Sequence, residues 1–229
     1  MHSRDNIQAA FGAAFPIVLG YVAIGIPCGI LSSSIGMNAL QVLMMCLLLY
    51  SGAGQFMLPN MWLAASPVAS IVASVSLVNM RHILYSTSIT SWVRDVPRPL
   101  SCFFAATITD ESFGVNMNRF LAGGWSVERA TLVNCFSWSS WTLSCVAGTF
   151  IADALNSPLP IAAFAMTSIF ICLMATQKMT PSNVVAIVAA VAGVFACKLV
   201  GLSGPSILLG ATFGVAAAIA FDRLREVVR

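Results

Sequence analysis

Long apolar stretches alternate with short polar connections along the whole chain. Because about 20 apolar residues are enough to cross a bilayer as an α-helix, this pattern predicts a succession of membrane spans. The approximate ranges of these spans are 9–32, 38–64, 67–91, 99–120, 128–152, 158–177, 181–199 and 203–221. The last two are short, so seven spans are an alternative to eight. We therefore expect an all-α, polytopic membrane protein with a single domain over residues 1–229.

Glycine and proline interrupt several of these apolar stretches. The second stretch contains Tyr50-Ser51-Gly52-Ala53-Gly54-Gln55 near its middle, where two glycines favour a break in the helix. A break at mid-membrane exposes backbone N–H and C=O groups, which transporters use to bind substrate. Small residues four apart, as at Gly25/Gly29 and Gly210/Gly214, favour close packing of helices. We expect some spans to be broken or kinked at such positions.

Composition supports a membrane protein and narrows its chemistry. Hydrophobic residues make up 59% of the chain and charged residues only 8%, whereas soluble domains average about 25% charged residues. No GxxxxGK[ST] loop is present, which argues against direct use of ATP. The cysteines lie in apolar segments without CxxC spacing, so neither disulfides nor a metal site is expected: Cys28, Cys46, Cys102, Cys135, Cys145, Cys172 and Cys197.

Two charged dipeptides, Arg81-His82 and Asp110-Glu111, lie inside the third and fourth spans. A charge at the centre of a span costs about 2.5–3.5 kcal/mol on insertion scales, and such residues mark substrate, ion or proton pathways. The two spans are joined by a short loop, and counting from it places Arg81 and Asp110 within about one helical turn of the same depth. An ion pair between Arg81 and Asp110 or Glu111 is therefore predicted.

Continuous helices would place these charges on polar faces. One stripe follows the third span and the other follows the fourth: Ser70, Ser74, Val78, Arg81, Tyr85 and Ser88; and Thr107, Asp110 or Glu111, Gly114 and Asn118. Neither face suits lipid, so both are expected to face protein or a water-filled cavity.

The charge count leaves one acid more than Arg81 can balance. Burial and a neighbouring carboxylate both favour the protonated form of an acid, so Asp110 or Glu111, together with His82, is predicted to couple transport to protons. Two other roles stay open for Arg81. It could form a structural ion pair, or it could bind a substrate carboxylate through two hydrogen bonds.

Four sequence blocks together resemble a known family. They are Phe15-Pro16-Ile17 with Gly20-Tyr21 and Gly25; Tyr50 to Phe56; Val78-Asn79-Met80-Arg81-His82-Ile83-Leu84-Tyr85; and Thr109-Asp110-Glu111-Ser112-Phe113. The chain resembles the AzlC-like large subunits of branched-chain amino acid exporters over roughly its first 120 residues. Ser51, Gly54, Cys28 and Gly114 depart from the residues expected at their positions, which leaves the substrate open.

The resemblance implies a secondary exporter of valine, leucine, isoleucine and methionine in the bacterial cytoplasmic (inner) membrane. It also implies a small AzlD-like membrane subunit as partner and no cofactor. With eight spans, seven Lys and Arg residues lie on the side of the termini and three on the other, which favours cytoplasmic termini. The residues expected to bind substrate are Tyr50, Ser51, Gly52, Gly54, Gln55, Asn79, Arg81 and Tyr85.

Two other classes of protein are alternatives to an exporter. A passive channel or facilitator for a small solute is the main alternative, and it would not need a titrating pair of acids. An intramembrane enzyme is disfavoured because no HExxH, GxSxG or cysteine–histidine set is present.

Overall fold

Among the residues it describes, the computed structural model contains α-helices and no strands; these residues are 2–154, 164, 167–168, 171, 175, 179–199, 201 and 206–227. The prediction of an all-α fold is confirmed. The predicted span over 158–177 lies largely outside the described residues. The chain divides into two compact units, Met1–Asn60 with Val78–Thr167 and Met61–Leu77 with Ser168–Arg229.

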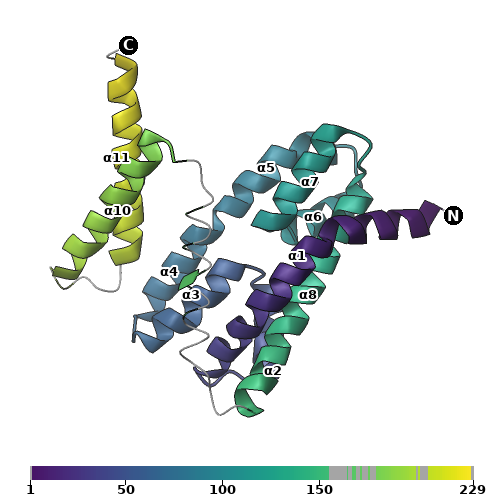
Figure 1. Cartoon of the computed structure of the whole chain (residues 1–229), viewed down its shortest axis with the longest axis horizontal. Helices are drawn as coiled ribbons and strands as arrows, with labels where there is room; N and C mark the ends of the chain where they lie inside the picture. The colour runs from purple at the N-terminus through teal and green to yellow at the C-terminus, as the bar shows by residue number, and fades with distance from the viewer. Residues whose placement is uncertain are drawn as a thin grey trace. The chain divides into compact units, whose positions relative to one another are not determined.

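The first unit is built around two long helices, α1 (His2–Ser33) and α8 (Val127–Ala154), which lie side by side (Figure 1). Glycine makes their close approach possible. A Cβ atom added at Gly29 would lie 1.9 Å from the carbonyl oxygen of Cys145, and one at Gly148 would lie 2.2 Å from that of Ile26. Gly25 is similarly close to Ser144. The packing role predicted for Gly25 and Gly29 is confirmed.

Shorter helices surround this pair. In chain order they are α2 (Ala39–Leu48), α3 (Gly52–Leu63), α5 (Arg81–Val93), α6 (Arg98–Ala106) and α7 (Asp110–Ala122). Helices α2, α6 and α7 pack against α8, and α5 packs against α7. A buried apolar cluster joins α5, α6, α7 and the start of α8: Ile89, Phe104, Ile108, Phe120, Val127 and Ala130. This cluster fixes the hairpin that carries the charged dipeptides.

The second predicted span is broken where the glycines indicated. Helix α2 ends at Leu48 and α3 begins at Gly52, so the range 38–64 consists of two half-helices. The third span is interrupted only mildly: α4 (Val68–Asn79) is followed by a turn at Met80 with helical dihedral angles, and Val68–Val93 still counts as one apolar stretch of 26 residues.

The fourth span differs from the expected continuous helix. Helix α6 ends at Ala106, and Asp110 is the first residue of α7. The expected stripe through Thr107 and Asp110 is therefore wrong. The physical reason is a capping box, in which Thr109 and Ser112 each accept a hydrogen bond from the other's backbone N–H and start a new helix. The break needs no glycine or proline.

The second unit contains the described residues of α4 up to Leu77 and the helices α10 (Pro181–Leu199) and α11 (Ser206–Val227). Helices α10 and α11 pack antiparallel through small residues. A Cβ atom at Gly210 would lie 2.9 Å from the carbonyl oxygen of Ala190, and one at Gly214 would lie 2.6 Å from that of Ala186. These glycines thus seat the chain's own helix, as the packing interpretation predicted.

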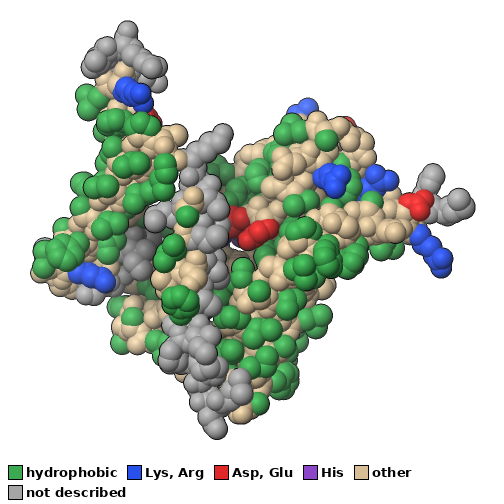
Figure 2. Space-filling model, viewed as in Figure 1, with side chains coloured by type: hydrophobic (Ala, Val, Ile, Leu, Met, Phe, Trp, Pro, Cys, Tyr) green, Lys and Arg blue, Asp and Glu red, His purple; other side chains and the backbone are tan. Residues whose placement is uncertain are grey.

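The helix surfaces are those of a membrane protein. Hydrophobic side chains cover most of the visible surface of α10 and α11, and of α1 and α8 (Figure 2). Large apolar residues such as Val188, Phe195 and Phe213 are more than half exposed. Among the described helices, Arg4–Ser33, Val68–Val93 and Pro181–Leu199 are long and apolar enough to cross a bilayer. The half-helices of the two broken spans, α2 with α3 and α6 with α7, are each too short to cross a bilayer alone.

Candidate functional site

Asp110 and Arg81 form the centre of the candidate site. Asp110 begins α7, where the positive end of the helix dipole stabilises a carboxylate. Its Oδ2 atom lies 2.8 Å from Nη2 of Arg81, and its Oδ1 atom accepts a hydrogen bond from the Tyr85 hydroxyl. The expected ion pair therefore forms with Asp110. Both oxygens of this carboxylate are engaged, and both charged side chains are about one-third exposed.

Glu111 has a different environment from its neighbour. Its Oε2 atom accepts a hydrogen bond of 2.6 Å from the Tyr21 hydroxyl on α1, which also lies 2.8 Å from Oγ1 of Thr109. No cationic side chain in the described part of the chain forms an ion pair with Glu111, and the residue is exposed. With Arg81 at +1 and the two acids at −1 each, the ionised cluster carries a formal charge of −1.

The break between α2 and α3 contributes the second half of the site. Ser51 accepts a hydrogen bond from the N–H of Gly54 at 3.2 Å and so caps α3. Its hydroxyl also donates to Oδ1 of Asn79, two residues before Arg81. The break is thereby connected to the segment that carries the charges. The first N–H groups of α3 have no partners within the helix, as at every helix start.

Gln55 closes the broken end of α2. Its amide donates hydrogen bonds to the carbonyl oxygens of Leu49 at 2.6 Å and Met45 at 3.3 Å, while its Oε1 atom accepts from Nε1 of Trp141 at 2.5 Å. Gln55 is fully buried. Each polar atom of this side chain is already bonded within the protein, so the structure shows it as a support for the break.

Polar side chains of α8 also satisfy the ends of the broken helices. Nε1 of Trp138 donates to the carbonyl oxygen of Cys46 in α2 at 3.1 Å. Asn134 donates to the carbonyl oxygen of Phe104 in α6 at 3.2 Å, and its Oδ1 accepts from Asn116 at 3.1 Å. Broken helices are tolerated at membrane depth only where protein or water satisfies the freed backbone groups. Helix α8 performs this role for both breaks.

Two buried polar atoms at the site have no hydrogen-bond partner within the described residues: the Tyr50 hydroxyl and Nε of Arg81. Tyr50 lies close enough to Glu111 and Tyr21 for electrostatic interaction. Buried polar atoms are nearly always hydrogen-bonded in native proteins. These two atoms are therefore available to a bound ligand.

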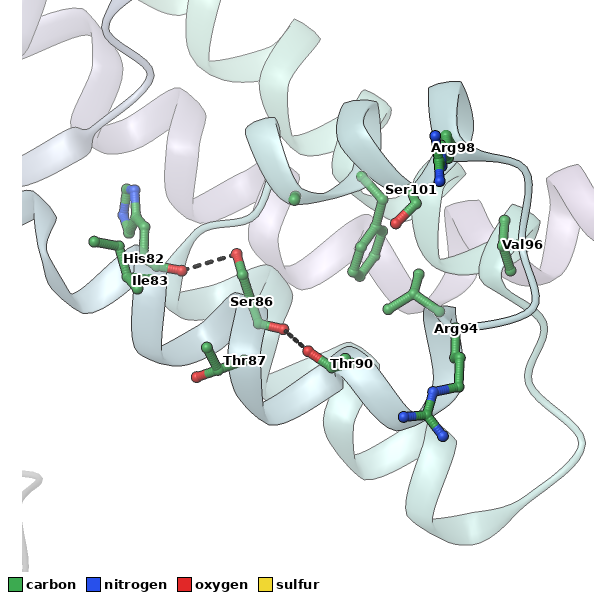
Figure 3. Close-up of a pocket in the computed structure, with 12 residues that line it drawn as sticks. His82, Ile83, Ser86, Thr87, Thr90, Arg94, Val96, Arg98 and Ser101 are labelled. Atoms are coloured by element: carbon green, nitrogen blue, oxygen red, sulfur yellow. Dashed lines mark hydrogen bonds between the residues drawn. The ribbon is translucent and has the colours of Figure 1, made fainter.

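His82 lies close enough to Arg81 and Asp110 for electrostatic interaction. Its ring is 6.0 Å from that of Tyr85, and it lines a pocket between α5 and α6 (Figure 3). No ion pair joins it to Asp110 or Glu111 among the described residues. Of the other predicted residues, Arg81 and Tyr85 contact Asp110, and Ser51 is joined to Asn79 and Gly54. Gly52 and Gln55 lie against Trp141 instead.

Sequence reasoning did not assign Tyr21, Thr109, Asn134 or Trp141 to the site. A signal was present for Thr109, because a threonine followed directly by two acids is typical of a helix start. Tyr21 had no such signal, since its partners lie 88 and 90 residues further along the chain. No group of three or more His, Cys, Asp or Glu side chains in the described ranges is arranged to hold a metal ion.

Comparison with known proteins places these residues in a family. The family model described as AzlC protein matches residues 16–155, which include every residue of the site. The branched-chain amino acid transport protein AzlC of Bacillus subtilis is 28% identical over 78% of this chain and 72% of its own length. The inner membrane protein YgaZ of Escherichia coli is 25% identical over 79% of this chain and 78% of its own.

An uncharacterized membrane protein of Archaeoglobus fulgidus matches further, with 27% identity over 88% of this chain and 89% of its own. No solved structure matches the chain. The family match covers more than half of the sequence and coincides with the broken helices and the Arg81–Asp110 pair. The chain belongs to the AzlC protein family.

Proposed function

We propose that this chain is a secondary transporter that exports branched-chain and other apolar amino acids, including methionine, across the bacterial inner membrane. The name of the Bacillus subtilis relative supports this substrate class. In our proposal a small AzlD-like membrane subunit completes the transporter, export is driven by protons, and the termini are cytoplasmic.

The observation that carries the proposal is the meeting of two broken helices at one charged cluster. The N-terminal ends of α3 and α7 are linked to it through the Ser51–Asn79 and Arg81–Asp110 contacts. Half-helices with their ends near mid-membrane are how many secondary transporters bind charged substrate groups. A passive pore needs no such arrangement. An enzyme would need a catalytic motif, and the sequence contains no HExxH, GxSxG or cysteine–histidine set.

The unpartnered groups suit the two ends of an amino acid. Its carboxylate would take hydrogen bonds from Nε of Arg81, the Tyr50 hydroxyl and the N–H groups of Gly52 and Ala53 at the start of α3. Its ammonium group would bind Glu111, the acid without a cationic partner in the described chain. The apolar side chain of the amino acid would contact the paired rings of Phe56 and Trp141.

Asp110 and Glu111 have different partners, and this difference offers a way to couple substrate export to proton movement. Asp110 is held by Arg81 and Tyr85, so it positions the arginine. Glu111 binds either a proton or the substrate's ammonium group, because one carboxylate cannot bind both at once. Exchange of the two across the membrane couples export to proton entry. His82, on the same helix as Arg81, passes protons to or from this region.

Efflux from proteoliposomes tests the proposal. Proteoliposomes that contain the protein, with or without the small subunit, are loaded with labelled valine. Efflux of the valine is then followed with and without a pH gradient. We expect gradient-driven, saturable efflux that Glu111→Gln uncouples from the pH gradient and His82→Gln slows. Asp110→Asn should reduce efflux at every pH, and Glu128→Gln, on α8 outside the site, serves as the matched control.

Two outcomes would count against this function. Absence of valine, leucine, isoleucine and methionine efflux in every preparation would refute the exporter. Efflux that neither saturates nor responds to a pH gradient would instead indicate a passive facilitator.

A further inference from the structure

The pocket between α5 and α6 lies within the first unit. Of the residues that line it, only His82 has a role in the proposed transport. The volume of the pocket is about 570 Å³. His82 lies at one end, and Arg94 and Arg98 lie at the other, with Ser86, Thr87 and Thr90 along α5 between them (Figure 3). The pocket is therefore a groove that follows the length of α5.

The positive end of the groove has no internal counterion. Arg94 follows the last residue of α5, and Arg98 is the first residue of α6. Both are exposed, and neither forms an ion pair within the part of the chain that the structure describes. Asp95 lies between them in sequence, so the loop keeps a formal charge of +1. Arginine binds phosphate through paired hydrogen bonds, so the end of the groove lined by these two residues suits a phosphate.

The rest of the groove suits hydrocarbon. Ile83, Val93, Val96 and Phe104 contribute apolar surface. The hydroxyls along α5 donate back to their own helix: Ser86 to the His82 carbonyl at 2.9 Å, and Thr90 to the Ser86 carbonyl at 3.0 Å. Thr87 likewise donates to the carbonyl oxygen of Leu84 at 2.9 Å. With these donors used, the wall offers methyl groups and little polarity to a ligand, which disfavours a water-soluble anion.

The length of the groove matches one leaflet of a bilayer. Arg94 and His82 are 12 residues apart, which corresponds to about 18 Å along a helix. Half of the hydrocarbon core of a bilayer is about 15 Å thick. A molecule with its phosphate at the arginines would thus have room for a chain that ends near His82.

We propose that this groove binds one anionic phospholipid, with its phosphate at the end lined by Arg94 and Arg98 and one acyl chain lying along α5 toward His82. Basic pockets between membrane helices bind anionic headgroups in this way. The lipid's hydrocarbon covers the apolar wall between α5 and α6, and its charge balances the two arginines. This binding is independent of the amino acid that the transporter carries.

Native mass spectrometry of the full-length protein tests the proposal, with dioleoyl phosphatidylglycerol as the probe and dioleoyl phosphatidylcholine and inorganic phosphate as comparisons. We expect one tightly retained phosphatidylglycerol. The double variant Arg94→Gln/Arg98→Gln should weaken its retention about 30-fold, from the contribution of two arginines near an anionic headgroup. Thr90→Trp, which fills the groove, should also abolish retention without changing charge.

The matched control is Arg223→Gln/Arg225→Gln on α11, which removes two exposed arginines from the other unit. It should retain the lipid as the unaltered protein does. Equal retention of phosphatidylcholine, or full retention in the Arg94/Arg98 variant, would overturn the proposal. Loss in that variant but not in Thr90→Trp, with displacement by inorganic phosphate, would show a phosphate site without an acyl groove. Displacement of the lipid by the small subunit would show a protein interface instead.

Discussion

The close contact between α1 and α8 allows a sharp prediction about Gly29. In Gly29→Ala, the new Cβ atom would lie 1.9 Å from the carbonyl oxygen of Cys145, whereas real Cβ atoms do not approach closer than 3.0 Å. The helices would have to separate locally by about 1.1 Å, the difference of these two distances. Overpacking of this kind costs about 1–3 kcal/mol. The oxygen belongs to the backbone, so no side chain can turn away to relieve the clash.

Thermal unfolding of the purified protein in detergent measures this cost. For a chain of 150–250 residues, 1 kcal/mol shifts the melting temperature by about 2–4 °C, so Gly29→Ala should melt about 2–12 °C lower. The matched controls are Gly12→Ala and Gly20→Ala on the same helix, where an added Cβ atom meets nothing within 4 Å. Each should leave stability unchanged or raise it by up to about 1 kcal/mol, because alanine favours a helix over glycine.

The relative melting temperatures of these three variants test whether α1 and α8 are in close contact. If Gly29→Ala is as stable as Gly12→Ala and Gly20→Ala, the close approach of α1 and α8 is wrong. Equal destabilisation by all three would point to a general requirement for glycine in α1, and it would also refute the reasoning from contact.

Three further predictions concern the broken helices and the second unit. Trp141→Phe leaves the buried Oε1 of Gln55 with only the weak Cys46 thiol as donor, at 3.9 Å, so it should lower the free energy of unfolding by about 1–3 kcal/mol; an unchanged melting curve would contradict this. In a double-mutant cycle, Arg81→Gln and Asp110→Asn should be coupled by about 0.5–3 kcal/mol in unfolding, and strictly additive effects would rule out the pair. Gly210→Val should disrupt the contact of α10 and α11, seen as faster proteolysis of this hairpin than in the unaltered protein.

The sequence predicted those parts of the site that depend on local signals. Two glycines after Ser51 indicated the break that the structure shows before Gly52. The ion pair of Arg81 with Asp110 followed from equal depth on neighbouring segments, a matter of helical rise alone. Such inferences need only distances along the chain and the cost of charge in a membrane.

The sequence could not predict what depends on distant partners. Asp110 was expected on the side of a continuous helix, and the capping residue Thr109 instead placed it at a helix start. His82 follows Arg81 directly, yet a helix turns by about 100° per residue, so Arg81 binds Asp110 while His82 lines the pocket between α5 and α6. The use of Gln55 to close α2 required Trp141, which lies 86 residues away.

The dependence of both breaks on α8 has a consequence for how the protein is made. Residues 39–122 leave the ribosome before Val127–Ala154, so the half-helices reach the membrane before their bonding partners exist. Until α8 arrives, the carbonyl oxygen of Cys46 lacks its donor Trp138, and that of Phe104 lacks Asn134 and accepts only from Thr107. Hydrocarbon offers no substitute for the missing donors. The early segments must therefore wait in contact with water or with the insertion machinery. Assembly of the first half of the protein is completed by a helix from the second.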